Sequence, residues 1–289
     1  MTVINTNVKA LYTQAALKTT ERNSLKAMQE LSTGKRINSA KDDAAGLAIS
    51  ARMTQQIEGL NQGIRNAGDA IAMIQTTEGA TQNVTTMLLR CSELAMQAAN
   101  DTYSDVQRSF LNNEFTQLKD EIQRMSLTHE WNGFKILAGK NRDGSSADAL
   151  SLYFQVGDSA DQRIKVDLPN FSKTGPVTAD IFVDPVSNSN TSISTVAGAQ
   201  VVIDLTKKVL DNVSESRSMM GAAMNRLEHV VDNLTNVSMN SSASRSQIED
   251  ADYAKSSTEL AKSQIMSQAA TAVLAQANTS QQTVLKLLG

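Results

Sequence analysis

The chain contains a long stretch in which apolar residues recur every three or four positions. Between residues 53 and 74 they are spaced 4-3-4-3-4-3, which buries one stripe of a helix against a partner helix. The members are Met53, Ile57, Leu60, Ile64, Ala67, Ile71 and Ile74. The stripe weakens near residue 77 and resumes at Val84, Leu88, Cys91 and Leu94. This pattern predicts a helix over residues 42–100, about 90 Å long, which needs neighbouring helices to cover its stripe.

The start of this helix is predicted from residues 39–42. Ser39-Ala40-Lys41-Asp42 fits a capping box, and Asp42 and Asp43 stand where the helix dipole favours negative charge. Further along, Gly59 and Gly63 each disfavour the helix by roughly 1 kcal/mol relative to alanine. These glycines either let a neighbouring helix approach closely or are tolerated defects.

Two further segments supply the neighbouring helices. Ser104-Asp105-Val106-Gln107 is a second capping box. Apolar residues with heptad spacing follow it from Leu111 to Met125, and again from Met220 to Val237. An ordinary compact bundle would show the same stripes, but their length favours a rod. The predicted rod core comprises Ile57, Leu60, Ile64, Ile71, Ile74, Leu118, Ile122, Leu227, Val230 and Leu234.

The middle of the chain has a different composition. Its three prolines, Pro169, Pro176 and Pro185, all lie there, and their absence elsewhere permits long helices on both sides. Short strands are predicted at residues 150–156 and 164–168, and a turn at 131–134. Residues 187–195 are almost all Ser, Asn and Thr, which predicts an exposed loop.

The two ends of the chain are distinctive because they lack charge where a solvated helix would carry it. No side chain from residue 263 to residue 285 is charged, which indicates burial against a similar surface. A disordered tail is the alternative. We expect both ends to fold together when neighbouring subunits surround them. The predicted packing residues are Leu11, Ala15, Leu25, Met28, Leu31, Leu260, Ile265, Ala269, Ala272 and Leu274.

Composition argues against several classes of protein. The 289 residues include 27 Lys and Arg against 30 Asp and Glu, a net charge of −3, which disfavours a nucleic-acid-binding surface. One cysteine and two histidines leave little material for a metal site or imidazole catalysis, so we expect no cofactor. No apolar stretch is long enough to span a membrane, and the first residues do not read as a cleaved secretory signal.

Several segments at both ends resemble bacterial flagellin. They are residues 3–7 (VINTN), 31–49 (LSTGKRINSAKDDAAGLAI), 75–80 (QTTEGA), 93–100 (ELAMQAAN), 244–254 (SRSQIEDADYA) and 273–278 (VLAQAN). The resemblance covers roughly residues 1–140 and 197–289 in the same order. Such long collinear matches are far more specific than a single short motif.

The resemblance implies a mainly α fold: long antiparallel heptad helices forming a rod, a terminal helical coiled-coil pair and a small central β-hairpin region. It implies an inner domain from residues 1–40 plus 253–289, a rod domain from 41–140 plus 197–252, and a central β excursion at 141–196. The implied function is a structural subunit, exported unfolded, that polymerises through its terminal helices into the extracellular flagellar filament used for motility.

The resemblance also implies partners. Besides other copies of the subunit, these are hook-associated junction and cap proteins, a cytoplasmic export chaperone at the C-terminal helix, and an innate immune receptor. Arg90, Leu94 and Glu114 occupy positions that resemble the receptor-contact motif of the family. The alternative is that Arg90 and Glu114 are charges at a subunit interface or in solvent. The sequence departs from the usual pattern at Leu89, Cys91 and Ser92, which we expect to weaken that contact because hydrogen-bonding groups are lost.

Other functions are weighed against this one. A zinc protease inserted between the two flagellin-like regions would need the motif His-Glu-x-x-His, but His129-Glu130 is not followed by the second histidine. A coiled-coil adaptor would fit the heptads without needing the uncharged end. A hook–filament junction protein would share the terminal pattern. Cys91, lying in the apolar stripe, is expected to be a small buried packing residue.

Overall fold

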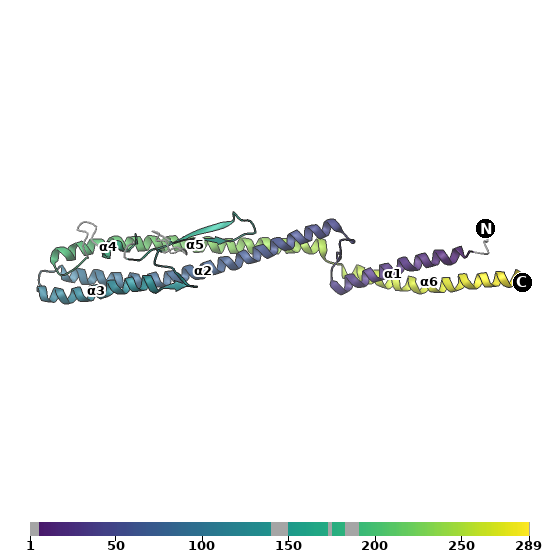
Figure 1. Ribbon diagram of the computed structural model, residues 1–289, viewed down its shortest axis with the longest axis horizontal. Helices are drawn as coiled ribbons and strands as arrows, with labels where there is room; N and C mark the ends of the chain where they lie inside the picture. The colour runs from purple at the N-terminus through teal and green to yellow at the C-terminus, as the bar shows by residue number, and fades with distance from the viewer. Residues whose placement is uncertain (1–5, 140–149, 173–174, 183–190, 289) are drawn as a thin grey trace. The chain divides into compact units, whose positions relative to one another are not determined.

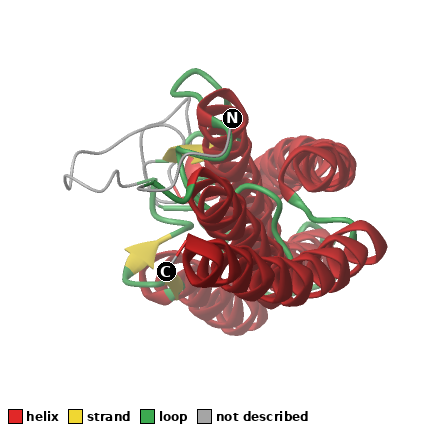
Figure 2. Cartoon of the chain, turned by 90° about the vertical axis from the view of Figure 1, so that its right-hand side faces the viewer, coloured by secondary structure: helices red, strands yellow, loops and turns green. Residues whose placement is uncertain are grey.

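The computed structural model describes residues 6–139, 150–172, 175–182 and 191–288, and helices make up most of this part of the chain (Figures 1 and 2). Its elements are α1 (Val8–Thr33), α2 (Ala44–Ala98), α3 (Asp105–Thr128), β1 (Glu130–Trp131), β2 (Phe134–Lys135), β3 (Leu150–Gln155), β4 (Arg163–Leu168), α4 (Ala179–Phe182), α5 (Val196–Glu249) and α6 (Tyr253–Leu288). The predicted fold class, mainly α with a small central β-hairpin region, is confirmed.

The chain divides into two compact units. The terminal unit comprises residues 1–57 and 239–289, and the central unit comprises residues 58–238. Both α2 and α5 contribute residues to each unit.

The terminal unit is built on the antiparallel pair of α1 and α6, which lie side by side (Figure 1). At one end of the pair, Asn7 Nδ2 donates to the carbonyl oxygen of Ala277 (3.3 Å). At the other end, Ser256 Oγ donates to Glu30 Oε2 (2.8 Å). These two hydrogen bonds join opposite ends of the two helices and so fix the antiparallel direction.

Helix α1 ends at a glycine because the chain must turn sharply there. Gly34 has φ 71°, the left-handed conformation that glycine adopts without strain, and its N–H donates to the carbonyl of Glu30 (2.9 Å). The segment after the turn pairs with the end of α5: Arg36 N donates to Glu249 O (2.7 Å) and Ala251 N to Gly34 O (2.9 Å). An ion pair between Lys35 and Glu249 reinforces this junction.

The prediction that Ser39–Asp42 forms the capping box of this helix is wrong, because a different residue caps α2. Asp43 lies directly before α2, and its side chain accepts a hydrogen bond from Gly46 N (2.8 Å). The Ser39 hydroxyl instead donates to Asp42 (2.9 Å) within a turn before the helix. That hydrogen bond is the main cause that holds the pKa of Asp42 below its ordinary value. Two adjacent aspartates compete for the cap, and the one next to the helix takes it.

The central unit is a bundle of α2, α3 and α5. Ser238 Oγ donates to Asn61 Oδ1 (3.1 Å) and Arg217 Nη2 lies 3.4 Å from Glu78 Oε1, so α5 runs antiparallel to α2. The capping box at Ser104 is confirmed, with both of its reciprocal hydrogen bonds present. Fully buried side chains from the three helices form one core, including Ile74, Leu88, Cys91, Leu94, Phe115, Ile122, Val209 and Leu227.

Two β-hairpins lie on this bundle. The turn predicted at residues 131–134 joins β1 to β2, with Asn132 at φ 48° and Gly133 at φ 80°, as a tight hairpin turn requires. The predicted strands at 150–156 and 164–168 form the antiparallel pair β3–β4, in which Leu150 faces Leu168. Along β4 buried Ile164, Val166 and Leu168 alternate with exposed residues, so one face of the hairpin joins the core.

Gly59 and Gly63 face the loop that follows β3. A Cβ atom at either position would collide with residues 156–158 of that loop, and Asn66 Nδ2 donates to the carbonyl of Gln155 (2.8 Å). Of the two alternatives for these glycines, close approach of a neighbour holds, but that neighbour is a hairpin loop and not the helix that the alternative named.

The prediction that residues 187–195 form an exposed loop is wrong for the described part, residues 191–195. Thr191 and Ile193 are buried. Lys119 Nζ donates to the carbonyl and hydroxyl oxygens of Thr191 (3.0 and 2.9 Å), and Asn112 Oδ1 accepts from Ile193 N (2.9 Å). Polar residues are buried here because α3 supplies their hydrogen-bond partners. Residues 187–190 lie outside the described residues.

Candidate assembly surfaces

The seam between α1 and α6 consists mainly of small and hydroxyl-bearing residues. Most buried and half-buried positions follow one heptad register on each helix: Ala10, Thr13, Leu17, Thr20, Ser24, Ala27 and Leu31 on α1, and Ser256, Leu260, Ser263, Ser267, Ala270, Leu274 and Ala277 on α6. Glu30 and Ser257 are half-buried outside this register. Leucine occupies four of these fourteen positions. Small side chains let the two helices approach closely but bury little apolar area between them.

Large apolar side chains lie instead on the outer faces of the same two helices. Leu11, Leu25 and Met28 of α1 are 56%, 65% and 50% exposed, and Ile265 of α6 is 65% exposed. Other exposed large residues of the pair are Val8, Tyr12, Tyr253, Met266 and Val273. Exposed large apolar side chains in such number make these outer faces a candidate interaction surface.

The predicted packing residues therefore fall into two groups. Leu31, Leu260 and Leu274 are half-buried in the seam of the pair. Leu11, Ala15, Leu25, Met28, Ile265, Ala269 and Ala272 are exposed on the outer faces. Sequence reasoning missed Tyr12, Tyr253 and Val273, which the heptad register would have placed outside the seam together with the others.

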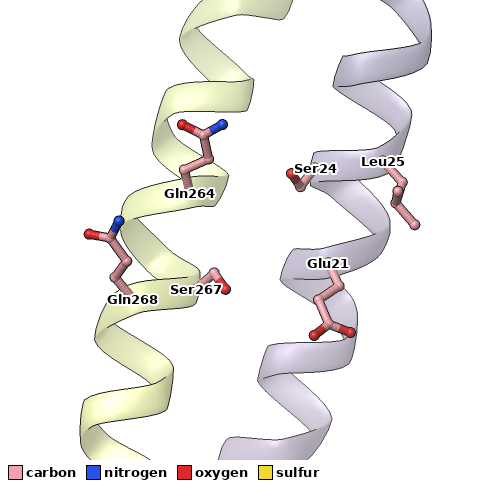
Figure 3. A pocket seen from close by; sticks show the side chains of 6 residues that line it. All are labelled: Glu21, Ser24, Leu25, Gln264, Ser267 and Gln268. Atoms are coloured by element: carbon pink, nitrogen blue, oxygen red, sulfur yellow. The ribbon is translucent and has the colours of Figure 1, made fainter.

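A shallow groove of about 490 Å³ runs along one side of the pair. Its walls are Glu21, Ser24 and Leu25 of α1 and Gln264, Ser267 and Gln268 of α6. Ser24 and Ser267 lie on the facing sides of the helices, whereas Leu25 points away from α6 (Figure 3). The groove is thus lined by five polar residues and one apolar residue.

The predicted rod-core residues are buried or half-buried. Ile57 in the terminal unit and Leu60, Ile74, Ile122 and Leu227 in the central unit are buried. Ile64, Ile71, Leu118, Val230 and Leu234 are half-buried, and the last four of these pack against the core of the central unit.

The candidate receptor-contact residues do not share one surface. Arg90 and Glu114 are exposed and paired: Arg90 Nη2 lies 2.8 Å from Glu114 Oε1, and Nη1 lies 3.1 Å from Glu93 Oε2. The hydrogen bonds that Arg90 donates to these carboxylates, the one to Glu114 first, raise its pKa above the ordinary value. Leu94 is fully buried in the core, so it supports this surface from behind.

Metal-binding groups do not converge in the described ranges. No group of three or more His, Cys, Asp or Glu side chains in residues 6–139, 150–172, 175–182 and 191–288 could hold a metal ion. Cys91 is buried, and burial raises the pKa of its thiol to about 12, so the reactive thiolate is strongly disfavoured. In the same part of the chain, each helix is too short or too polar to cross a membrane.

Models of two protein-family regions match the chain. The bacterial flagellin N-terminal helical region matches residues 4–142, and the bacterial flagellin C-terminal helical region matches residues 203–288. The chain therefore belongs to the bacterial flagellin family. It is a structural subunit of the flagellar filament and not an enzyme.

Full-length relatives agree with this assignment. The chain is 41% identical to a flagellin of Halalkalibacterium halodurans over 286 residues, covering 99% of each chain. It is 38% identical to a flagellar filament core protein of Brachyspira hyodysenteriae over 288 residues, again covering 99% of each. A solved structure of a flagellar hook-associated protein from Vibrio parahaemolyticus matches with a TM-score of 0.58 at 13% identity, covering 72% of this chain and 100% of that one. That match bears on the fold alone.

Proposed function

We propose that this subunit enters the filament through the outer faces of α1 and α6. The observation that carries the proposal is the inverted arrangement of the pair, with small residues in the seam and large apolar residues outside. Copies of the same pair offer matching surfaces, so contacts between subunits would bury these side chains. A contact in which one face meets a different face of the next copy generates an open helical polymer.

The domain roles follow from this proposal. Residues 1–40 and 253–289 form the inner domain that packs with neighbouring subunits, and residues 41–140 and 197–252 form the rod domain. Residues 141–196, whose described part contains β3 and β4, would be a β excursion of the rod that faces the outside of the filament.

Export before assembly fits the same ends of the chain. The α1–α6 seam buries little apolar area, so the isolated pair gains little to offset the entropy of ordering its backbone. A subunit with flexible ends can pass a narrow export channel unfolded and be secreted to the cell exterior. The uncharged stretch of α6 is the segment that a cytoplasmic export chaperone would cover.

Other partners follow from the open ends of the polymer. The first and last subunits present outer faces that no further copy covers, so hook-associated junction proteins and a cap protein would bind there. On the central unit, Arg90 and Glu114 would contact an innate immune receptor, with Leu94 packed behind them.

Seeded polymerisation tests the proposed assembly surface. Leu25→Glu places a charge on the outer face of α1, and we expect it to abolish filament growth because a buried unpaired charge is strongly unfavourable. Leu25→Met keeps the position apolar and is the matched control. Electron microscopy should show long tubular fibres for the wild type and for Leu25→Met.

The proposal fails if Leu25→Glu elongates seeds like the wild type. A discrete dimer that never elongates, under any condition, would favour the coiled-coil adaptor instead.

A further inference from the structure

Two of the twelve methionines lie on the outer faces of the terminal helices. Met28 of α1 is 50% exposed, and Met266 of α6 is 52% exposed. Each stands among other exposed apolar residues of its helix, with Leu25 one turn before Met28 and Val273 two turns after Met266. Both thioethers are therefore accessible to small molecules in the free subunit.

The thioether is the one group on these faces that a mild peroxide converts directly. Its sulfur lone pair attacks one peroxide oxygen, the O–O bond breaks, and the products are a sulfoxide and water, or an alcohol from an alkyl peroxide. Leucine, isoleucine and valine at neighbouring positions have no comparable group. The change turns a flexible apolar side chain into a polar one.

The α1–α6 pair itself would tolerate this change. Its heptad seam is formed by Ala, Ser, Thr and Leu and includes neither methionine, so a sulfoxide at position 28 or 266 stays in water as long as the subunit is free. In the polymer the sulfoxide oxygen would be buried against a neighbouring copy, where a polar atom without a partner is costly.

We propose that Met28 and Met266 are oxidation sites at which a peroxide blocks the free subunit from entering the filament. The inference rests on the proposed assembly surface. Incorporation into the polymer covers both thioethers, so subunits that are already assembled are protected. Oxidants thus act on subunits awaiting assembly and leave the finished filament intact.

The test compares seeded elongation of each protein, treated with hydrogen peroxide, with its own untreated sample. For the wild type we expect treatment to slow elongation about tenfold, the effect of one unsatisfied polar group in a buried contact. Met28→Leu/Met266→Leu keeps apolar side chains of similar size and should retain most of its own untreated rate. Met96→Leu/Met219→Leu removes two methionines that are exposed on the central unit and should remain as sensitive as the wild type.

Peptide mass spectrometry supplies an independent readout. Positions 28 and 266 should gain one oxygen in the free subunit faster than in filaments. Equal oxidation in both states overturns the inference, as does equal peroxide sensitivity of the wild type and Met28→Leu/Met266→Leu. Failure of the untreated wild type to elongate contradicts the proposed function itself, and with it the inference.

Discussion

Gly63 of α2 lies directly against the backbone of Val156. A Cβ atom at position 63 would come 2.4 Å from the Val156 carbonyl oxygen, and one at Gly59 would come 2.9 Å from Asp158 Cβ. The two glycines lie four residues apart on one face of the helix, so the loop after β3 packs directly against the helix backbone at both positions.

We expect Gly63→Ala to lower the free energy of unfolding by about 1–3 kcal/mol, the usual cost of forcing extra atoms into a packed site. Alanine favours the helix by about 1 kcal/mol over glycine, so helix propensity alone would predict a gain in stability, and the expected loss comes from the collision with the loop. Gly68 of the same helix has no atom within 4 Å of an added Cβ, and Gly68→Ala should raise stability. Urea denaturation measures both variants; equal gains would show that the loop does not rest on Gly63.

Because the Cys91 thiol is buried, we expect the protein to lose stability at high pH. Burial raises the pKa of its thiol from 9.0 to about 12. Below pH 9 the thiol is protonated in both the folded and the unfolded chain, and its contribution to stability is fully present. Between pH 9 and 12 only the unfolded chain loses the proton, so stability falls by about 1.4 kcal/mol per pH unit.

Urea unfolding at pH 8 and pH 10.5 measures this effect. The wild type should lose about 2 kcal/mol more than Cys91→Ala over that interval, because all other titrating groups are shared. Parallel pH profiles for the two proteins would contradict the assigned burial of the thiol.

The size of the seam residues predicts a third effect. Ala27 is 3% exposed where α1 faces α6, so Ala27→Leu should push the helices apart and cost about 1–3 kcal/mol. We expect the critical concentration for polymerisation to rise about tenfold. Ala27→Ser retains a side chain of the size found along the seam and should stay close to the wild type. A normal critical concentration for Ala27→Leu would argue against this register of the pair.

Immune recognition provides a fourth prediction. Arg90→Ala removes a guanidinium that is exposed beside Glu93 and Glu114. We expect receptor signalling in a reporter assay to fall about tenfold, as for loss of a hydrogen bond to a charged group. Arg124→Ala is the control, because Arg124 is an exposed arginine of α3 paired with Glu121. Equal signalling from Arg90→Ala and the wild type would reject the contact.

Heptad spacing predicted the long helices well because burial of one stripe dominates their folding. The strands at 150–155 and 163–168 and the turn at Asn132 and Gly133 also follow from local sequence. The seam residues of the terminal pair could not be predicted from local sequence, because α1 and α6 carry apolar residues on more than one face. By residue type alone, Leu25 is as good a candidate for the seam as Ala27. Only the helix register separates the two.

Long-range contacts account for the remaining errors. The partner of Gly63 is a loop more than ninety residues away in sequence, which spacing within one helix cannot identify. Burial of Thr191 depends on Lys119 of α3, so a polar segment that looks solvated is in fact packed. At the start of α2, two adjacent aspartates offered equivalent acceptors and the local pattern selected the wrong residue.

The composition of the α1–α6 seam has a consequence for how these ends are kept folded. With the proposed assembly surface, two helices that hold each other mainly through alanine, serine and threonine would derive most of their stability from surrounding copies, in the way that a protein is stabilised by a ligand. The melting temperature of these helices would then depend on the concentration of subunits. Dilution, more than heat, is the perturbation to which the ends of this chain should be most sensitive.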